Sequence, residues 1–217
     1  MEINNINFRH PFFMYIIGKS EAGKTYFVNN VVDDALKKKF KVVYIVNKAF
    51  PVEKEIEERQ EKHKNVYIIE TGNLEKPTID FITSSMTTNK RKLLIFDNFT
   101  YSLTLPFLNF TTFSRKYNAS VVLIAHSLFA SKIISPRLRE LVSYFVLFYM
   151  PDVESVERIL TTRQAELFEE HIKFRTFKFL LIDNANSTYL ISKLPEFKVN
   201  LIWDKEKREK EKKLKFN

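Results

Sequence analysis

Short runs of consecutive apolar residues, many of them β-branched or aromatic, recur along most of the chain. Such runs are typical of strands buried on both faces, because a half-exposed strand alternates apolar and polar positions. The predicted strands are Phe12–Ile17, Lys41–Val46, Val66–Glu70, Leu93–Asp97, Ser120–Ala125, Tyr144–Tyr149, Phe177–Asp183 and Thr188–Ser192.

Several of the segments between these strands have helical character, namely Thr25–Lys39, Val52–Lys64, Leu105–Tyr117 and Val153–Glu170. Strands that alternate with helices predict a mainly parallel sheet with helices on both faces, which is a three-layer α/β fold. The last two strands differ, because only residues 184–187 separate them and this Asn- and Ser-containing spacer suits a tight turn. We therefore expect a C-terminal antiparallel hairpin at the edge of the sheet.

The composition is that of a domain with a substantial core and no thiol chemistry. The chain has 217 residues, of which 45% are hydrophobic, and it contains no cysteine. Disulfides, thiolate metal sites and cysteine nucleophiles are therefore excluded, and a reducing intracellular environment suits the chain. No apolar run approaches the roughly 20 residues of a membrane span, so we expect no transmembrane segment.

Basic residues outnumber acidic ones, 35 against 26, which gives a formal net charge of +9. This excess favours a polyanionic partner such as nucleic acid, but it also fits a merely soluble basic protein. The end of the chain is rich in lysine, arginine and glutamate. We therefore divide the chain into one domain at 1–203 and a basic tail at 204–217. The tail is either a solvated extension or an arm that contacts nucleic acid or a shell protein.

One motif carries specific chemistry. The strand Phe12–Ile17 runs directly into a segment that matches G-x-x-x-x-G-K-[ST] and opens a predicted helix. The motif consists of Gly18, Lys19, Ser20, Glu21, Ala22, Gly23, Lys24 and Thr25. Its glycines let the backbone amides face inward, and the helix N-terminus adds partial positive charge, so we expect it to bind nucleotide phosphates. Lys24 is expected to reach the β and γ phosphates, and Thr25 to supply a hydroxyl to Mg²⁺.

A magnesium nucleotide site also needs a carboxylate at the end of a neighbouring strand, and Asp97 ends Leu93–Asp97 after four apolar residues. The simpler reading of Asp97 is a strand-terminal acid at a turn. Asn98 follows it, and an amide cannot take the proton of an attacking water, so the general base lies elsewhere or hydrolysis is slow. Glu70, at the end of Val66–Glu70, is our candidate base, and its simpler reading is a solvated acid.

Three further side chains are candidates for catalysis. His126 follows the strand Ser120–Ala125, where it either senses the γ-phosphate and orients the attacking water or simply caps the strand. Arg115 and Arg139 lie outside the predicted strands, at what we expect to be the nucleotide end. Each is a candidate arginine finger toward a neighbouring subunit, or else a surface or ion-paired arginine.

Ordered blocks of the chain resemble the FtsK–HerA superfamily of ring-forming DNA-translocating ATPases. Within it they look most like the poxvirus-type genome-packaging ATPases of double-stranded DNA viruses with an internal membrane. The blocks are GKSEAGKT, LLIFDN, SRKYNASVVLIAHS, RELVSYFVLF and FLLIDNANSTYLIS, and together they span about residues 12–192. The resemblance implies a P-loop NTPase fold of the RecA/ASCE type.

The resemblance also implies roles for individual residues. Lys24 and Thr25 would bind phosphate and magnesium, Asp97 would be the Walker B acid, and Arg115 and Arg139 would align with arginines of the motifs around the sensor. Two positions depart from the family pattern. Asn98 stands where relatives usually carry a second acid, and His126 stands where they usually carry a glutamine.

The implied function is an ATP-driven motor that packages double-stranded DNA into a capsid as a homo-oligomeric ring, with ATP and Mg²⁺ as ligands. The implied location is the host cytoplasm and the virion, with capsid or membrane-associated shell proteins as further partners. Two alternatives stay open. A P-loop kinase would want a lid of clustered arginines and an acceptor-binding acid, which the sequence does not show. A nucleotide-dependent assembly factor with little turnover stays open because Asn98 stands where a second acid would support hydrolysis.

Overall fold

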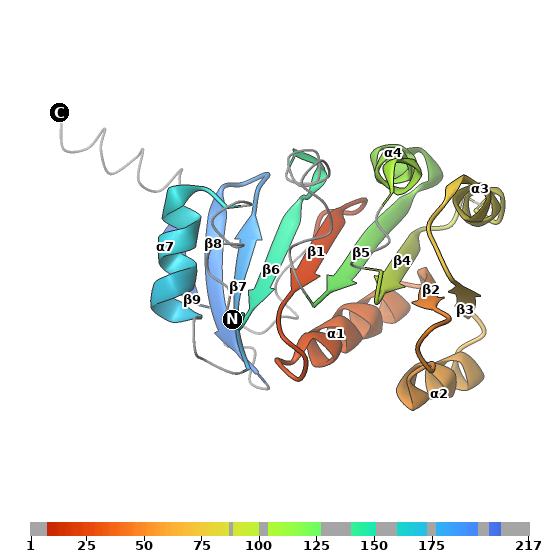
Figure 1. Cartoon of the computed structure of the whole chain (residues 1–217), viewed down its shortest axis with the longest axis horizontal. Helices are drawn as coiled ribbons and strands as arrows, with labels where there is room; N and C mark the ends of the chain where they lie inside the picture. Colours follow the sequence, from red (N-terminus) through yellow and green to blue (C-terminus); the bar gives the residue numbers. More distant parts are fainter. Residues whose placement is uncertain are drawn as a thin grey trace.

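The computed structural model describes residues 8–86, 89–99, 104–126, 140–150, 160–172, 177–194 and 200–204. These residues form one sheet with the strands β1 (Phe13–Ile17), β2 (Lys41–Asn47), β3 (Val66–Thr71), β4 (Lys92–Asp97), β5 (Ala119–Ala125), β6 (Tyr144–Phe148), β7 (Lys178–Asp183), β8 (Thr188–Lys193) and β9 (Asn200–Asp204). Their order across the sheet is β3-β2-β4-β5-β1-β6-β7-β8-β9 (Figure 1). The strands from β3 to β6 in this order pair in parallel, and β7, β8 and β9 add antiparallel pairs.

Helices cover both faces of the sheet (Figure 1). They are α1 (Lys24–Lys37), α2 (Lys54–Lys62), α3 (Lys76–Ser84), α4 (Leu105–Phe113), the 3₁₀ helix η2 (Ser114–Tyr117) and α7 (Thr162–His171). Buried residues of α1 and α2 pack in one apolar cluster with one face of the sheet, whereas those of α3, α4 and α7 pack in a second cluster with the opposite face. The predicted three-layer α/β fold with a mainly parallel sheet is confirmed.

The predicted strands are all present, each with one end shifted by one residue, but two details of the sheet were wrong. β3 is half-exposed rather than buried, with Tyr67 42% exposed, because it forms the outer edge of the described sheet. The antiparallel hairpin of β7 and β8 is confirmed, yet it does not form the other edge, because β9 pairs with β8 beyond it. The sequence did not predict β9.

The helices show similar differences. The predicted helix Leu105–Tyr117 is α-helical only to Phe113 and continues as η2. In the described part of Val153–Glu170, α7 begins at Thr162 behind a capping box formed by Thr161 and Gln164, and residues 153–159 lie outside that part. The sequence also missed α3, which buries only Ile79 and Ile82.

Two further expectations concern the ends of the molecule and membranes. β9 extends to Asp204, and residues 205–217 lie outside the described residues, so the basic tail stays a prediction. Among the helices of the described segments, none combines the length and the apolar character that a membrane span requires.

Candidate nucleotide-binding site

The parallel strands β1, β2, β4 and β5 end at the same edge of the sheet and bring their following residues together. In the register of the strands, Ile17 of β1 faces Ala125 of β5, and Asp97 of β4 faces both Ile124 of β5 and Val46 of β2. The loop after β1, Asn98 after β4, His126 after β5 and the segment after β2 therefore meet at one edge. The carboxyl ends of parallel strands are where α/β sheets place ligands.

The loop at residues 18–23 needs its two glycines for different reasons. A Cβ on Gly18 would lie 2.5 Å from the Cβ of Phe148, so only glycine lets the loop pass β6 this closely. Gly23 has a φ of 104°, a conformation that side chains disfavour, and it directly precedes α1. The Lys19 amide donates to the carbonyl of Tyr149 (2.9 Å), which fixes the loop against the end of β6. The amides in the first turn of a helix point toward its N-terminal end, so those at the start of α1 suit phosphate oxygens.

Lys24 is folded back onto this loop and is only 5% exposed. Its Nζ donates to the carbonyls of Gly18 (2.8 Å) and Lys19 (2.8 Å) and lies 3.1 Å from Nδ1 of His126. Burial lowers the pKa of Lys24 to about 8, and the charge of Asp97 acts in the opposite direction. Thr25, the expected Mg²⁺ ligand, is exposed beside it.

Asp97 is partly buried at the end of β4. Burial raises its pKa to about 6, the charge of Glu53 adds to this increase, and the Asn98 amide and Lys24 oppose it. Glu53 is thus a second acid near Asp97, which the sequence reasoning missed. The available signal was its position, because Glu53 follows β2, whose carboxyl end lies beside Asp97, and immediately precedes α2.

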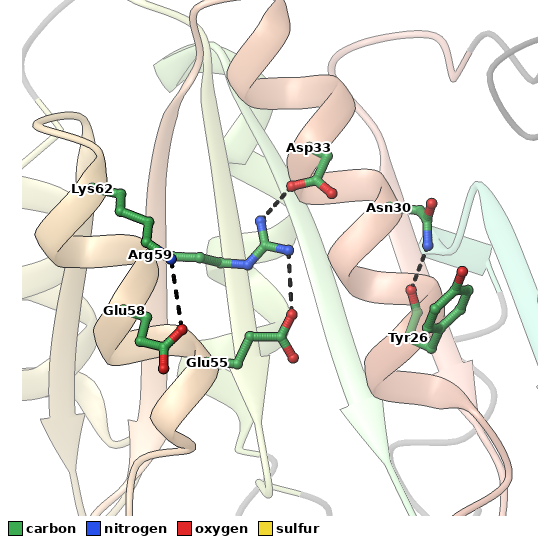
Figure 2. Close-up of polar contacts among 7 residues, drawn as sticks. All are labelled: Tyr26, Asn30, Asp33, Glu55, Glu58, Arg59 and Lys62. Atoms are coloured by element: carbon green, nitrogen blue, oxygen red, sulfur yellow. Dashed lines mark hydrogen bonds and ion pairs between the residues drawn. The ribbon is translucent and has the colours of Figure 1, made fainter.

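An ion pair joins α2, which Glu53 precedes, to α1, which begins at the phosphate loop. Arg59 of α2 pairs with Asp33 of α1 and with Glu55 on its own helix (Figure 2). The Arg59 side chain is only 14% exposed, so this contact lies between the two helices. The ion pair therefore links the position of Glu53 to that of α1.

His126 contacts both Asn98 and Lys24. Nε2 of His126 lies 2.9 Å from Oδ1 of Asn98, and Nδ1 lies 3.4 Å from Oγ of Ser20. Asn98 has a φ of 62°, and its carbonyl accepts a hydrogen bond from the side chain of Asn47 (3.1 Å). Burial lowers the pKa of His126, and the charge of Lys24 lowers it further. The sequence placed both residues at strand ends but did not predict their contact.

The other predicted catalytic residues are not part of this cluster. Glu70 ends at the same edge, but β2 separates it from Asp97, because Val46 faces Glu70 on one side and Asp97 on the other. Arg115 lies in η2 before β5, at the opposite edge of the sheet, so its expected position at the nucleotide end was wrong. Arg139 lies outside the described residues.

The residues at the site fit a magnesium nucleotide. The described part of the chain holds no group of three or more His, Asp or Glu side chains that could bind a metal by themselves. Mg²⁺ does not require such a group, since it usually takes one or two carboxylates together with phosphate oxygens and water. Asp97, whose pKa is raised beside a second acid, and the hydroxyl of the exposed residue Thr25 are the matching donors.

Comparisons with solved structures place this fold among viral and bacterial P-loop ATPases. The DNA-packaging ATPase B204 of Sulfolobus turreted icosahedral virus matches with a TM-score of 0.68 and 14% identity over 85% of this chain and 98% of its own. B204 of Sulfolobus turreted icosahedral virus 2 in complex with ATPγS matches with a TM-score of 0.64 and 15% identity over 84% and 97%. The cytoplasmic domain of the type VII secretion ATPase EccC of Thermomonospora curvata matches with a TM-score of 0.60 and 11% identity over 84% and 24%.

Sequence comparison identifies the family. No curated protein matches the chain significantly. The model of the family described as "Poxvirus A32 protein", however, matches residues 3–180, which is most of the chain. The chain therefore belongs to the poxvirus A32 protein family, and its fold and phosphate loop are those of a P-loop ATPase.

Proposed function

We propose that this protein uses ATP hydrolysis to drive double-stranded DNA into a viral capsid. One observation carries the proposal: a phosphate loop whose Lys24 contacts His126 and lies near Asp97, in a chain of the poxvirus A32 family. The solved complex of B204 with ATPγS, in the same fold, supports nucleotide binding by this chain. The host cytoplasm and the virion are the corresponding proposed locations, and capsid or membrane-associated shell proteins the further partners.

The residues at the site divide the work of binding and activating ATP. The loop amides and the start of α1 would hold the phosphates, and Lys24 would exchange the carbonyls of Gly18 and Lys19 for β- and γ-phosphate oxygens. Thr25 and Asp97 would hold Mg²⁺, with Asp97 acting through water. Bound Mg²⁺ supplies positive charge that neutralises the phosphate oxygens as negative charge develops on them.

We further propose that DNA is bound through its phosphates. The net charge of +9 favours such binding, which has little sequence preference and weakens steeply as salt rises. A salt titration of affinity on two unrelated duplexes tests this, and a flat response would contradict it. Deleting residues 205–217 asks whether the basic tail contributes, and unchanged affinity would place the contact in the domain.

A homo-oligomeric ring is the proposed assembly, with Arg115 or Arg139 acting on the neighbouring subunit's nucleotide. β5 separates Arg115 from its own site by seven residues, about 20 Å, so Arg115 does not reach the nucleotide of its own subunit. Mixing an arginine variant with Lys24→Ala should restore some activity, because some interfaces then pair an intact loop with an intact finger. No recovery in confirmed mixed rings would overturn the role in trans.

Turnover with and without double-stranded DNA tests the proposed function. Stimulation by DNA in the wild type, absent in Lys24→Ala, is the expected result. Turnover that ignores DNA but requires a small acceptor would indicate a kinase. The second candidate function is an assembly factor that binds ATP without fast hydrolysis. Asn98, in place of the usual second acid, favours that candidate, and nucleotide binding without turnover would establish it.

A further inference from the structure

We propose that His126 is the general base of ATP hydrolysis and that Asn98 holds its ring in the tautomer this role requires. The proposal rests on the proposed ATPase function and concerns the step for which the sequence offered only Glu70. It explains how a chain that lacks the second acid of its relatives can still deprotonate the attacking water.

The contacts of Lys24 determine which ring nitrogen of His126 carries the proton. An ammonium group has three N–H donors and no acceptor. The Nζ of Lys24 lies within hydrogen-bond distance of Gly18 O, Lys19 O and Nδ1 of His126. Nδ1 must therefore accept, so the proton is on Nε2, which donates to Oδ1 of Asn98 at 2.9 Å.

Asn98 is suited to orient this ring without charging it. The residue is held by its left-handed backbone, with a φ of 62°, and by the hydrogen bond from Asn47 to its carbonyl. A carboxylate at the same place would favour the imidazolium form, in which Nδ1 can no longer accept a proton. An amide oxygen fixes Nε2–H and leaves Nδ1 basic. Burial and the charge of Lys24, which both lower the pKa of His126, also favour the neutral ring.

ATP binding changes the group that donates a hydrogen bond to Nδ1. When Lys24 turns to the phosphates, a water molecule beside the γ-phosphate replaces the ammonium as donor to Nδ1. The water oxygen then bonds to the γ-phosphorus while the bond from that phosphorus to the bridging oxygen of ADP breaks, and ADP leaves with the electron pair. The water proton passes to Nδ1, and the imidazolium later returns it to solvent or to the released phosphate.

The position of His126 favours it as the base over Glu70 and Glu53. A general base must reach the attacking water within hydrogen-bond distance. His126 contacts both Lys24 and Ser20 of the phosphate loop, whereas β2 lies between Glu70 and Asp97. Glu53 raises the pKa of Asp97 through its charge, and its backbone carbonyl accepts the first hydrogen bonds of α2. Of the charged groups at this edge, Lys24 contacts the ring and acts on its pKa.

The first test measures the protonation state and tautomer of the His126 ring directly, and it does not depend on turnover. ¹⁵N-labelled histidine in the full chain, without nucleotide, should show His126 as the neutral Nε2–H tautomer at pH 7. Lys24→Ala should raise the pKa of His126, because the substitution removes the positive charge beside Nδ1. A neutral ring protonated on Nδ1, or a charged ring at pH 7, would overturn the assignment.

The second test uses the acid limb of the pH–rate profile, which is the fall in turnover at low pH that occurs when the general base becomes protonated. His126→Gln should lower turnover about a hundredfold or more and abolish the limb while Mg²⁺–ATP still binds, and His63→Gln should change neither. Asn98→Asp should shift the limb to higher pH, because a carboxylate raises the pKa of the ring. A shift to lower pH, with turnover no longer sensitive to His126→Gln, would mean that the new carboxylate is the base.

The outcomes also separate this proposal from the ATPase function itself. DNA-stimulated turnover with an unchanged limb in His126→Gln overturns the role of His126 alone. A wild type that shows the expected tautomer but no turnover overturns the base and the ATPase function together. Loss of activity in Glu53→Gln or Glu70→Gln, with His126→Gln fully active, would transfer the role to that carboxylate.

Discussion

Asp97→Asn should stabilise the metal-free protein at neutral pH although it removes a residue of the candidate site. The pKa of Asp97 is raised from 3.8 to about 6 in the folded chain, chiefly by burial and then by the charge of Glu53. A group with a raised folded pKa contributes its full stability below the unfolded pKa and loses it as the pH rises through the folded pKa. Above pH 6 the ionised carboxylate of Asp97 therefore destabilises the folded state.

The size of this cost follows from the two pKa values. The difference between 3.8 and about 6 corresponds to about 3 kcal/mol at pH 7.5, at 1.36 kcal/mol for each pKa unit. Asparagine keeps the shape without the charge, so about 3 kcal/mol is an upper bound on the gain. At pH 4.5 only the interval from 3.8 to 4.5 counts, and the difference should shrink to about 1 kcal/mol.

Urea denaturation in EDTA at the two pH values measures this gain. Asp80→Asn is the matched control, because Asp80 is 60% exposed in a surface ion pair and should show little effect at either pH. With Mg²⁺–ATP the order should invert, since ligand stabilises the wild type and not Asp97→Asn. A variant that is less stable than the wild type at pH 7.5 without metal would refute the reasoning.

Three further predictions concern the loop and its support. Lys24→Ala should lose the thermal stabilisation by Mg²⁺–ATP that the wild type shows, and equal stabilisation of both would remove Lys24 from the site. Gly18→Ala should destabilise the protein by about 1 to 3 kcal/mol in urea, because its Cβ would meet that of a β6 residue at 2.5 Å. Gly72→Ala, whose Cβ would meet only the movable end of a lysine, should cost less, and equal losses would contradict the explanation. Arg59→Ala should cost about 1 to 2 kcal/mol in the same assay. Lys62→Ala, whose side chain is 69% exposed, should cost little, and a loss equal to that of Arg59→Ala would contradict the role of the helix contact.

The strands and the phosphate loop were predictable because their signals are local. The strand ending at Ile17 is apolar throughout, and the motif behind it contains two of the chain's three glycines. β9 and α3 carry weaker local signals. β9 belongs to the sheet through its pairing with β8, and α3 through two buried isoleucines, and both depend on partners distant in sequence.

The site was predictable only as far as it follows from single strands. Lys24 and Asp97 each follow from a local pattern, but the contact of Asn98 with His126 requires β4 and β5 to be neighbours. The position of Arg115 was available from the sequence and was misread. Arg115 precedes a strand that runs parallel to β1, and the phosphate loop follows β1, so the two must lie at opposite edges.

Displacement of a third strand from double-stranded DNA tests the central claim most directly, because it requires movement along the duplex and not merely hydrolysis. The wild type should release a bound triplex-forming oligonucleotide when ATP and Mg²⁺ are present, and Lys24→Ala should leave it in place. DNA-stimulated hydrolysis by the wild type without any release of the third strand would contradict the account of this chain as a DNA-translocating packaging motor.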